Sequence, residues 1–244
     1  WTSGAHHADW IFCLVRTDPD ARKQEGISTL LIDMRSPGIS LRPIVGIHGF
    51  HLFNQVFFDD VVVPAENRVG EENQGWTVAK SLLEYERLNL ARVPENRRRL
   101  AKARAIGEQV TEAGRPLREH EWFQRRFVEL DVRLEALAAT VQRFRQQAEA
   151  GKPPGQETGM LKLVGSQLIQ EIENLCVDAV GPDSVAYDRD AHFSLEGHAA
   201  AMAEGRSEYA PAVSARRFVT RGFTIAGGSS EIQHELLAKQ VLGI

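Results

Sequence analysis

The sequence has few cysteines, no long apolar run and no large excess of charge of either sign, and each shortage excludes a class of protein. Cys13 and Cys176 are its only cysteines, and their wide separation argues against a disulfide framework or a clustered-thiolate metal site. The longest apolar run, from Trp10 to Val15, is far shorter than the ~20 residues that a membrane-spanning helix needs. With 29 basic and 33 acidic residues, the charge favours neither nucleic acid nor an anionic membrane as a partner.

The remaining composition is that of an ordinary globular chain. Its 244 residues, 43% of them hydrophobic and 25% charged, are enough for one large domain or two modest ones. Two separate, reduced cysteines fit a cytoplasmic location. The chain begins with Trp1 instead of Met and shows no signal peptide, which suggests that the sequence is a fragment.

Residues 1 to about 66 have the pattern of β-strands. Four short runs rich in β-branched and aromatic residues are separated by turn-forming residues, and they cover residues 9–17, 28–34, 39–45 and 55–63. No helical period fits between these runs. We therefore expect an antiparallel meander instead of βαβ units.

After Pro64, apolar residues recur every three or four positions, which predicts helices. The predicted helices cover residues 75–93, 122–150, 159–180, 211–220 and 230–242, and residues 188–205 are expected to form a loop. The longest helices can pack as an antiparallel bundle. The predicted fold class is α+β, with a barrel- or sandwich-like antiparallel β-domain over residues 1–66 and a four-helix-type bundle over residues 67–244.

Glu86 lies on the apolar face of the predicted helix 75–93. At about 100° per residue, it falls in the middle of the stripe formed by Ala79, Leu82 and Leu90. A carboxylate with apolar neighbours must be paired with a cation or carry a proton. Enzymes that abstract protons use such carboxylates as bases. Two interpretations stay open on the pattern alone: a catalytic base, or a structural glutamate paired with one of the arginines at 97–99.

The segment 226–233 joins a glycine-rich turn to a predicted helix start. Gly227 and Gly228 allow a ligand to approach the backbone closely, and Ser230 with Gln233 has the spacing of a capping box. Such a turn presents free N–H groups to a phosphate or an oxyanion. The alternative is an ordinary capped helix.

Two further groupings have less specific patterns. The indole of Trp1 and the hydroxyls of Thr2 and Ser3 would suit stacking and hydrogen bonding to a planar heterocycle. The pairs at 6–7 and at 48 and 51 are histidines in turn-rich segments without a carboxylate or thiol at ligand spacing. We expect these histidines to be polar loop residues and predict no metal site.

Four segments together resemble the acyl-CoA dehydrogenase family. Residues 1–10 (WTSGAHHADW) resemble its flavin-contacting "W-[TS]-[ST]" strand, and residues 56–64 (VFFDDVVVP) resemble the last strand of its middle β-domain. Residues 70–76 (GEENQGW) match its loop "G-x-x-N-x-G-W". Residues 227–233 (GGSSEIQ) with 241–243 (VLG) are similar to its terminal "GGTSEIQ…VLG". Their order and spacing fit the family across the whole chain.

The resemblance implies an oxidoreductase, an FAD flavoprotein of fatty acid metabolism and lipid degradation. Its reaction would be the α,β-dehydrogenation of an acyl-CoA thioester, in which a glutamate removes the α-proton and a hydride passes to flavin N5. The family also implies an electron-transfer flavoprotein as electron acceptor, and a homo- or hetero-oligomer such as a dimer or homotetramer. Family members carry an N-terminal helical domain and the first part of the β-domain ahead of the Trp motif. These parts are expected to be missing from this sequence.

By the same resemblance, eight residues are assigned to the cofactor: Trp1, Thr2, Ser3, Arg115, Gly181, Gly228, Ser229 and Glu231. Gly181 is what remains of the family's Gln-x-x-Gly-Gly-x-Gly segment. The Arg-x-x-Phe-Gly segment, which reaches the pyrophosphate of the neighbouring subunit's FAD, has no clean match, and Arg115 or Arg125 is expected to replace its arginine.

The position of the catalytic base also follows from the resemblance. In the commonest form the base belongs to a "Y-E-G-T" segment, whose glutamate aligns with Gly227; the carboxylate is lost, while the N–H of Gly227 remains for the thioester oxyanion. Isovaleryl-CoA and long-chain relatives place the base on the first long helix, just before an arginine, and here that position is Glu86, followed by Arg87. Glu86 is therefore the predicted base, with Glu231 in reserve. The alternatives are a non-catalytic or cofactor-completing subunit of a hetero-oligomer, or an acyl-CoA oxidase of the same fold.

Overall fold

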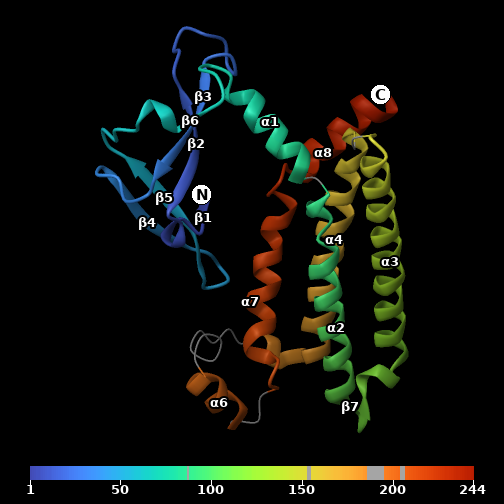
Figure 1. Cartoon of the computed structure of the whole chain (residues 1–244). Helices are drawn as coiled ribbons and strands as arrows, with labels where there is room; N and C mark the ends of the chain where they lie inside the picture. The colour runs from blue at the N-terminus through green and yellow to red at the C-terminus, as the bar shows by residue number, and fades with distance from the viewer. Residues whose placement is uncertain (87, 153–154, 186–194, 204–206) are drawn as a thin grey trace. The chain divides into compact units, whose positions relative to one another are not determined.

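The structure is a computed structural model that describes residues 1–86, 88–152, 155–185, 195–203 and 207–244. It divides into two compact units, Trp1–Glu86 and Arg87–Ile244. Short antiparallel strands make up most of the first, the β unit, and helices make up most of the second, the helical unit (Figure 1). The predicted order, an antiparallel β-domain followed by a helical domain, is confirmed.

The β unit contains two three-stranded antiparallel sheets, with the strand orders β1–β5–β4 and β2–β3–β6. The strands are β1 (Thr2–Ser3), β2 (Trp10–Arg16), β3 (Ile27–Asp33), β4 (Ile39–Val45), β5 (His51–Phe58) and β6 (Arg68–Val69). The predicted single meander is wrong, because β3 pairs with β2 on one side and β6 on the other. No edge of β3 is left for β4, which pairs with β5 instead. The described strands do not close into a barrel.

Helix α1 (Gly75–Glu86) packs on β3 and belongs to the β unit. The contact is close: a Cβ on Gly75 would lie 2.5 Å from the carbonyl carbon of Ser28, so only glycine fits there. Thr29 Oγ1 donates to the carbonyl oxygen of Gly75 at 3.3 Å. The compact units consequently divide after Glu86, whereas the sequence period changes after residue 66. The domain boundary at 66/67 remains a prediction.

The helical unit is arranged around α4. Its helices are α2 (Val93–Gln109), α3 (Glu121–Glu149), α4 (Gly159–Val180), α6 (Leu195–Ala203), α7 (Ala210–Arg221) and α8 (Ser230–Leu237), with the short hairpin β7 (Thr111–Glu112) and β8 (Arg115–Pro116) between α2 and α3. α4 contacts α2, α3, α7 and α8. None of the described helices has the length and apolarity needed to cross a membrane.

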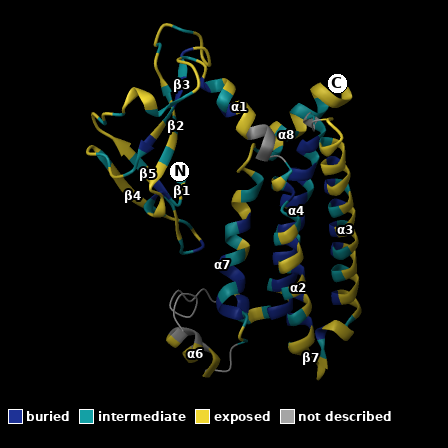
Figure 2. Ribbon diagram, viewed as in Figure 1, coloured by how far each residue is buried: buried dark blue, intermediate teal, exposed yellow. Residues whose placement is uncertain are grey.

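The core of the helical unit lies along α4. Leu168, Ile172 and Leu175 have no exposed surface, and buried positions follow this helix over most of its length (Figure 2). Near the start of α4, the backbone of Ala91 lies very close to the helix, because a Cβ on Gly165 would lie 2.3 Å from the carbonyl oxygen of Ala91. This glycine therefore permits α4 to pack directly on the backbone before α2.

Three segments differ from their predicted secondary structure. The helix expected over 75–93 ends at Glu86, and α2 begins at Val93, where the pattern predicted an end. Arg92, with φ 50°, is not helical, and Pro94 suits the first turn of a new helix because it needs no N–H partner there. In the segment 188–205, expected to be a loop, residues 195–203 form α6, and the others lie outside the described residues. The last helix, predicted as 230–242, consists of α8 and a π-helical turn, Ala238–Leu242.

Candidate functional site

The glycine turn before α8 has the geometry that its sequence predicts. Gly227 and Gly228 have φ values of 72° and 87°, in the region that favours glycine. A Cβ at these positions would lie 2.9 Å from Leu90 Cδ2 and 2.5 Å from Gln233 Nε2, respectively. Within the described residues, the N–H of Gly227 has no hydrogen-bond acceptor. It is therefore free to bind an anionic oxygen.

The N-cap of α8 is Ser229, one residue earlier than predicted. Its Oγ accepts a hydrogen bond from the N–H of Ile232 at 3.4 Å. The predicted capping box of Ser230 and Gln233 is wrong, because Ser230 Oγ donates to Thr224 O (3.3 Å) and Gln233 Nε2 donates to Gly227 O (3.2 Å). Gln233 thus reaches past the cap and holds the glycine turn.

Glu231 lies in the first turn of α8 and is exposed. Hydrogen bonds from its own N–H and from Ser229, then the charges of His234 and Lys162, lower the pKa of the Glu231 carboxyl. A carboxylate that holds its negative charge this firmly is a weak base. The lowered pKa disfavours the reserve role of base, and the assignment of Glu231 to the cofactor stays a prediction.

Lys162, which the sequence analysis did not single out, supports the same turn. It lies in α4 with only 3% of its surface exposed, and its Nζ donates to Thr224 O at 3.0 Å. Burial lowers the pKa of its ammonium, while Glu231 acts in the opposite direction. A single lysine inside the apolar run MLKLV was the signal that could have identified it.

The predicted flavin-contacting strand is β1, at the edge of one sheet. Thr2 pairs with Asn54 and Ser3 with Phe53 on β5. Trp1 is 85% exposed, and its ring meets Phe53 edge to face with the centroids 5.9 Å apart. An exposed indole beside two hydroxyl-bearing residues fits the predicted contact with a planar ring.

A buried asparagine behind β1 was also missed. Asn54 is 1% exposed, and its Nδ2 donates to the carbonyl oxygen of Thr2 at 3.2 Å. An asparagine inside the strand HLFNQVFF, where side chains alternate between the two faces, was its only signal. Not all the histidines are loop residues as predicted, because His51 lies in β5. No group of three or more metal-ligating side chains occurs among the described residues.

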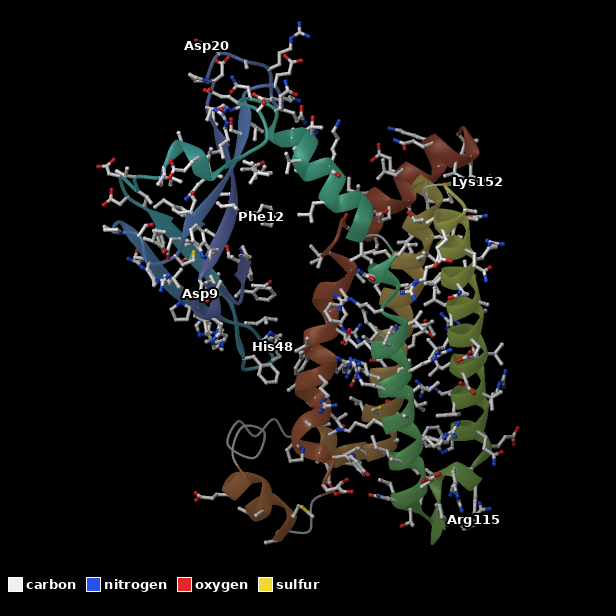
Figure 3. All side chains as sticks on the ribbon, in the orientation of Figure 1. Asp9, Phe12, Asp20, His48, Arg115 and Lys152 are labelled. Carbon is white, nitrogen blue, oxygen red and sulfur yellow. The ribbon has the colours of Figure 1, made fainter. Side chains whose placement is uncertain are left out.

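The remaining cofactor candidates lie in the helical unit. Gly181 caps the C-terminus of α4 with φ 72°, and no atom outside its neighbours lies within 4 Å of where its Cβ would be. Arg115 lies on the hairpin between α2 and α3 (Figure 3). With Arg125 it lines a surface depression of about 580 Å³ that also contains Glu119 and Glu121. Both arginines proposed to replace the family's arginine thus face one depression.

The structure does not bring all of these candidates together. The turn at Gly227 lies at the N-terminal end of α4, where a Cβ on Gly159 would lie 2.6 Å from Gln233 Oε1. Gly181 lies at the opposite end of this 22-residue helix, roughly 33 Å away at 1.5 Å per residue. The helical unit therefore presents two separate groups of candidate residues.

Glu86 is the last residue of α1. Its side chain and that of Arg87 lie outside the described residues, so its role as base stays a prediction. Two of the arginines that could have paired with it have other partners: Arg97 binds Glu135 (2.9 Å), and Arg99 binds both Glu95 and Glu173. Arg97 and Arg98 are exposed, whereas Arg99 is partly buried.

Comparison with known families agrees with this geometry. Residues 73–242 match the family described as acyl-CoA dehydrogenase, C-terminal domain. The chain belongs to the acyl-CoA dehydrogenase family. It is 32% identical over 247 residues to acyl-CoA dehydrogenase FadE34 of Mycobacterium tuberculosis, a match that covers 100% of this chain and 30% of that protein.

Solved structures of acyl-CoA dehydrogenases have the same fold. The ChsE4–ChsE5 complex from Mycobacterium tuberculosis aligns with a TM-score of 0.79 at 26% identity, over 100% of this chain and 59% of that one. The Tcur3481–Tcur3483 steroid acyl-CoA dehydrogenase aligns with a TM-score of 0.78 at 25% identity, over 100% and 58%. The chain thus spans about a third to three fifths of the length of these relatives. The resemblance and the fold class predicted from the sequence are both confirmed.

Proposed function

We propose that the chain is part of an FAD-dependent acyl-CoA dehydrogenase that removes hydrogen from the α and β carbons of an acyl-CoA thioester. The observation that carries this proposal is the glycine turn before α8. At the family position of the "Y-E-G-T" glutamate the chain has Gly227, whose N–H is free of acceptors among the described residues. This position can bind the thioester oxygen but cannot supply a base, so the base must come from elsewhere.

Glu86 is the residue proposed to remove the α-proton. It occupies the apolar stripe of α1 and the family position of the base in isovaleryl-CoA and long-chain relatives. As the proton leaves, negative charge develops on the thioester oxygen. The N–H of Gly227, next to the N-terminus of α8, stabilises this charge because it is already oriented by the turn.

The residues of β1 fit a flavin. The exposed indole of Trp1 offers a face for stacking, and Thr2 and Ser3 offer hydroxyls on a strand that β5 holds. When bound, the flavin supplies the acceptor for the hydride from the β-carbon. Glu231, with its lowered pKa, keeps a fixed negative charge beside the glycine turn.

The distance along α4 supports an oligomer. Gly227 and Gly181 lie at opposite ends of a helix roughly 33 Å long, and Arg115 lies on the hairpin between α2 and α3. We propose that each end serves a different cofactor, one bound by the chain itself and one by a neighbouring subunit. An electron-transfer flavoprotein is the proposed acceptor of the electrons.

The test is Glu86→Gln in the whole protein. This change keeps the size of the side chain but removes the base, so bleaching of the flavin absorbance by acyl-CoA should fall by at least about 100-fold. FAD should remain bound. Glu84→Gln, two positions earlier on α1, is the matched control and should leave the bleaching within about twofold of the unchanged protein.

The result would contradict the assignment if Glu86→Gln turned over acyl-CoA at the original rate. A panel of acyl-CoAs in the same titration identifies the substrate. We propose a bulky acyl group, because a steroid acyl-CoA dehydrogenase is among the structures that share the fold at 25% identity.

A second candidate function is that of a subunit that completes the cofactor site of a different catalytic partner. The ChsE4–ChsE5 structure is a complex of two proteins, and the arginine and glycine segments of this chain depart from the family pattern. Purification distinguishes the two functions. A colourless protein that yields activity only with a co-expressed homologue supports the second candidate, whereas a yellow, active protein on its own supports the first.

A further inference from the structure

Three side chains form a polar cluster behind the strand that carries Trp1, Thr2 and Ser3. Asn54 on β5 donates from Nδ2 to Thr2 O (3.2 Å), and the same Nδ2 lies 3.1 Å from His6 Nδ1. The other amide atom, Oδ1, lies 2.7 Å from His51 Nε2. The rings of His6 and His51 stack with centroids 3.9 Å apart. These contacts join β1, the turn after it and β5 through one buried amide.

The carbonyl oxygen of Thr2 determines the protonation of the whole cluster. A carbonyl oxygen only accepts hydrogen bonds, so the Asn54 amide must face it with Nδ2. Because Nδ2 only donates, His6 Nδ1 must be an unprotonated acceptor. His51 Nε2 must then carry the hydrogen that Asn54 Oδ1 accepts. The cluster is complete only while His6 is neutral.

Protonation of His6 would break this arrangement. It would place two donors, Asn54 Nδ2 and His6 Nδ1, opposite each other, and it would charge one of two stacked imidazoles. The titratable groups that face His6 are His51 on β5 and His7 on its own turn, and no described carboxylate is among them. The proton would gain no counter-charge.

The direction of the pH dependence follows. Burial, then the charges of His51 and His7, lower the pKa of His6 from its ordinary value of 6.5. The unfolded chain therefore binds this proton more readily than the folded one. The stabilisation from His6 is complete above pH 6.5 and is lost as the pH falls below 6.5, toward the lowered pKa of the folded state.

We propose that Asn54 is a positioning residue for the strand Thr2–Ser3, and that His6 makes this position depend on pH. The inference rests on the proposed function, because the strand matters for activity through its contact with a flavin. β1 is only two residues long, and beyond its pairing with β5 it is tied by the bond from Gly4 N to Leu52 O (2.9 Å). The hydrogen bonds of Asn54 are therefore a large part of the interactions that hold β1 in place.

The first test measures how strongly the strand is protected from hydrogen exchange, in the absence of the flavin. Hydrogen exchange of residues 1–5 in the whole protein, expressed as protection factors corrected for intrinsic rates, should fall about tenfold between pH 7.5 and 5.5, the loss expected for about one hydrogen bond. His6→Asn puts an amide oxygen near the position of Nδ1 and cannot titrate in this range. In this variant the protection should stay at its pH 7.5 value. His7→Asn is the matched control and should keep the original pH response.

The second test measures the affinity for FAD by flavin fluorescence over the same pH range. The dissociation constant should rise about tenfold on acidification, and His6→Asn should remove the rise. Asn54→Leu, which keeps the size but loses all three polar contacts, should weaken FAD binding and lower the protection at both pH values. A residue with a merely structural role would change stability without removing the pH dependence.

The outcomes separate this inference from the proposed function. A pH response of the strand that persists fully in His6→Asn overturns the inference, as does unchanged protection in Asn54→Leu. A protein that loses protection as expected but binds no FAD at any pH overturns the proposed function and still supports the role of Asn54. An affinity for FAD that is the same at pH 5.5 and 7.5 in the unchanged protein overturns the pH dependence.

Discussion

The two units of the molecule differ in where they keep their large apolar side chains. The helical unit buries them along α4, where Leu168 and Ile172 have no exposed surface. The β unit leaves many at its surface, including Trp1 (85% exposed), Trp10 (52%) and Phe12 (54%), and Figure 2 shows far fewer buried positions there. The helical unit has a continuous buried core, whereas the β unit as described buries few of its large apolar side chains.

The helical unit also buries charge, and the buried carboxylate of Glu173 is paired with an arginine. Arg99 lies between Glu95 and Glu173, and the side chain of Glu173 is 4% exposed. Arg97 on α2 pairs with Glu135 on α3, and both of these side chains are more than half exposed. Both interactions join an arginine to a glutamate, so comparing them measures how burial changes the contribution of an ion pair to stability.

The largest effect is expected for Glu173→Gln. Loss of this carboxylate leaves the buried guanidinium of Arg99 short of a counter-charge, which should lower the free energy of unfolding by about 3–5 kcal/mol. Glu135→Gln removes an exposed partner and should cost less than about 1 kcal/mol. Urea denaturation followed by far-UV circular dichroism measures both. Equal losses would show that burial does not distinguish the two pairs.

A somewhat smaller loss of stability is expected for an apolar substitution in each unit, and the two substitutions compare the units directly. Ile172→Ala opens a cavity in the core of the helical unit and should cost about 2–5 kcal/mol. Phe12→Ala removes a larger side chain from β2, but about half of it is already in contact with solvent, so the cost should be about 1 kcal/mol. Thermal and urea unfolding of the two variants give these values. A larger loss for Phe12→Ala would contradict the contrast between the units.

The last prediction concerns the rates at which the two thiols, one in each unit, are alkylated. Burial raises the pKa of Cys176 to about 12, and it raises the pKa of the half-buried Cys13 as well. Because the thiolate is the reactive form, Cys13 should be alkylated about 100-fold faster than Cys176 at pH 8. Mass spectrometry after timed iodoacetamide treatment resolves the two sites. Similar rates would mean that the helical unit opens as readily as the β unit.

The sequence was sufficient for elements with a strong, local period. Alternation predicted a strand over 9–17 and the structure has β2 at Trp10–Arg16, and the helix predicted over 159–180 is α4, with the same bounds. It failed where a distant contact or one residue overrides the period. The helix expected over 75–93 ends at Glu86, and a new helix begins at Val93. The N-cap lies at Ser229 instead of Ser230, and Gln233, expected in a capping box, bonds to Gly227 O.

The residues of the candidate site also fall into those that the sequence indicated and those that only the structure revealed. Gly227 and Gly228 were identifiable because positive φ values leave a mark in the sequence, namely glycine. Asn54 and Lys162 each leave the mark of a polar residue among apolar ones, but their partners could not be identified, because each acts through a carbonyl oxygen far along the chain, on Thr2 and Thr224 respectively. A backbone acceptor is the same in every residue, so no pattern of side chains could indicate it.

By itself, the sequence determined the antiparallel strands, the helices α3 and α4, the glycine turn and the family of this protein, because each depends on neighbouring residues or on a short motif. Only the tertiary structure decided which strands share a sheet, that α1 packs on β3, and that Asn54 ties β1 to His6 and His51. The physical reason is that these depend on which hydrogen-bond partners and apolar surfaces remain unsatisfied once the local elements have formed.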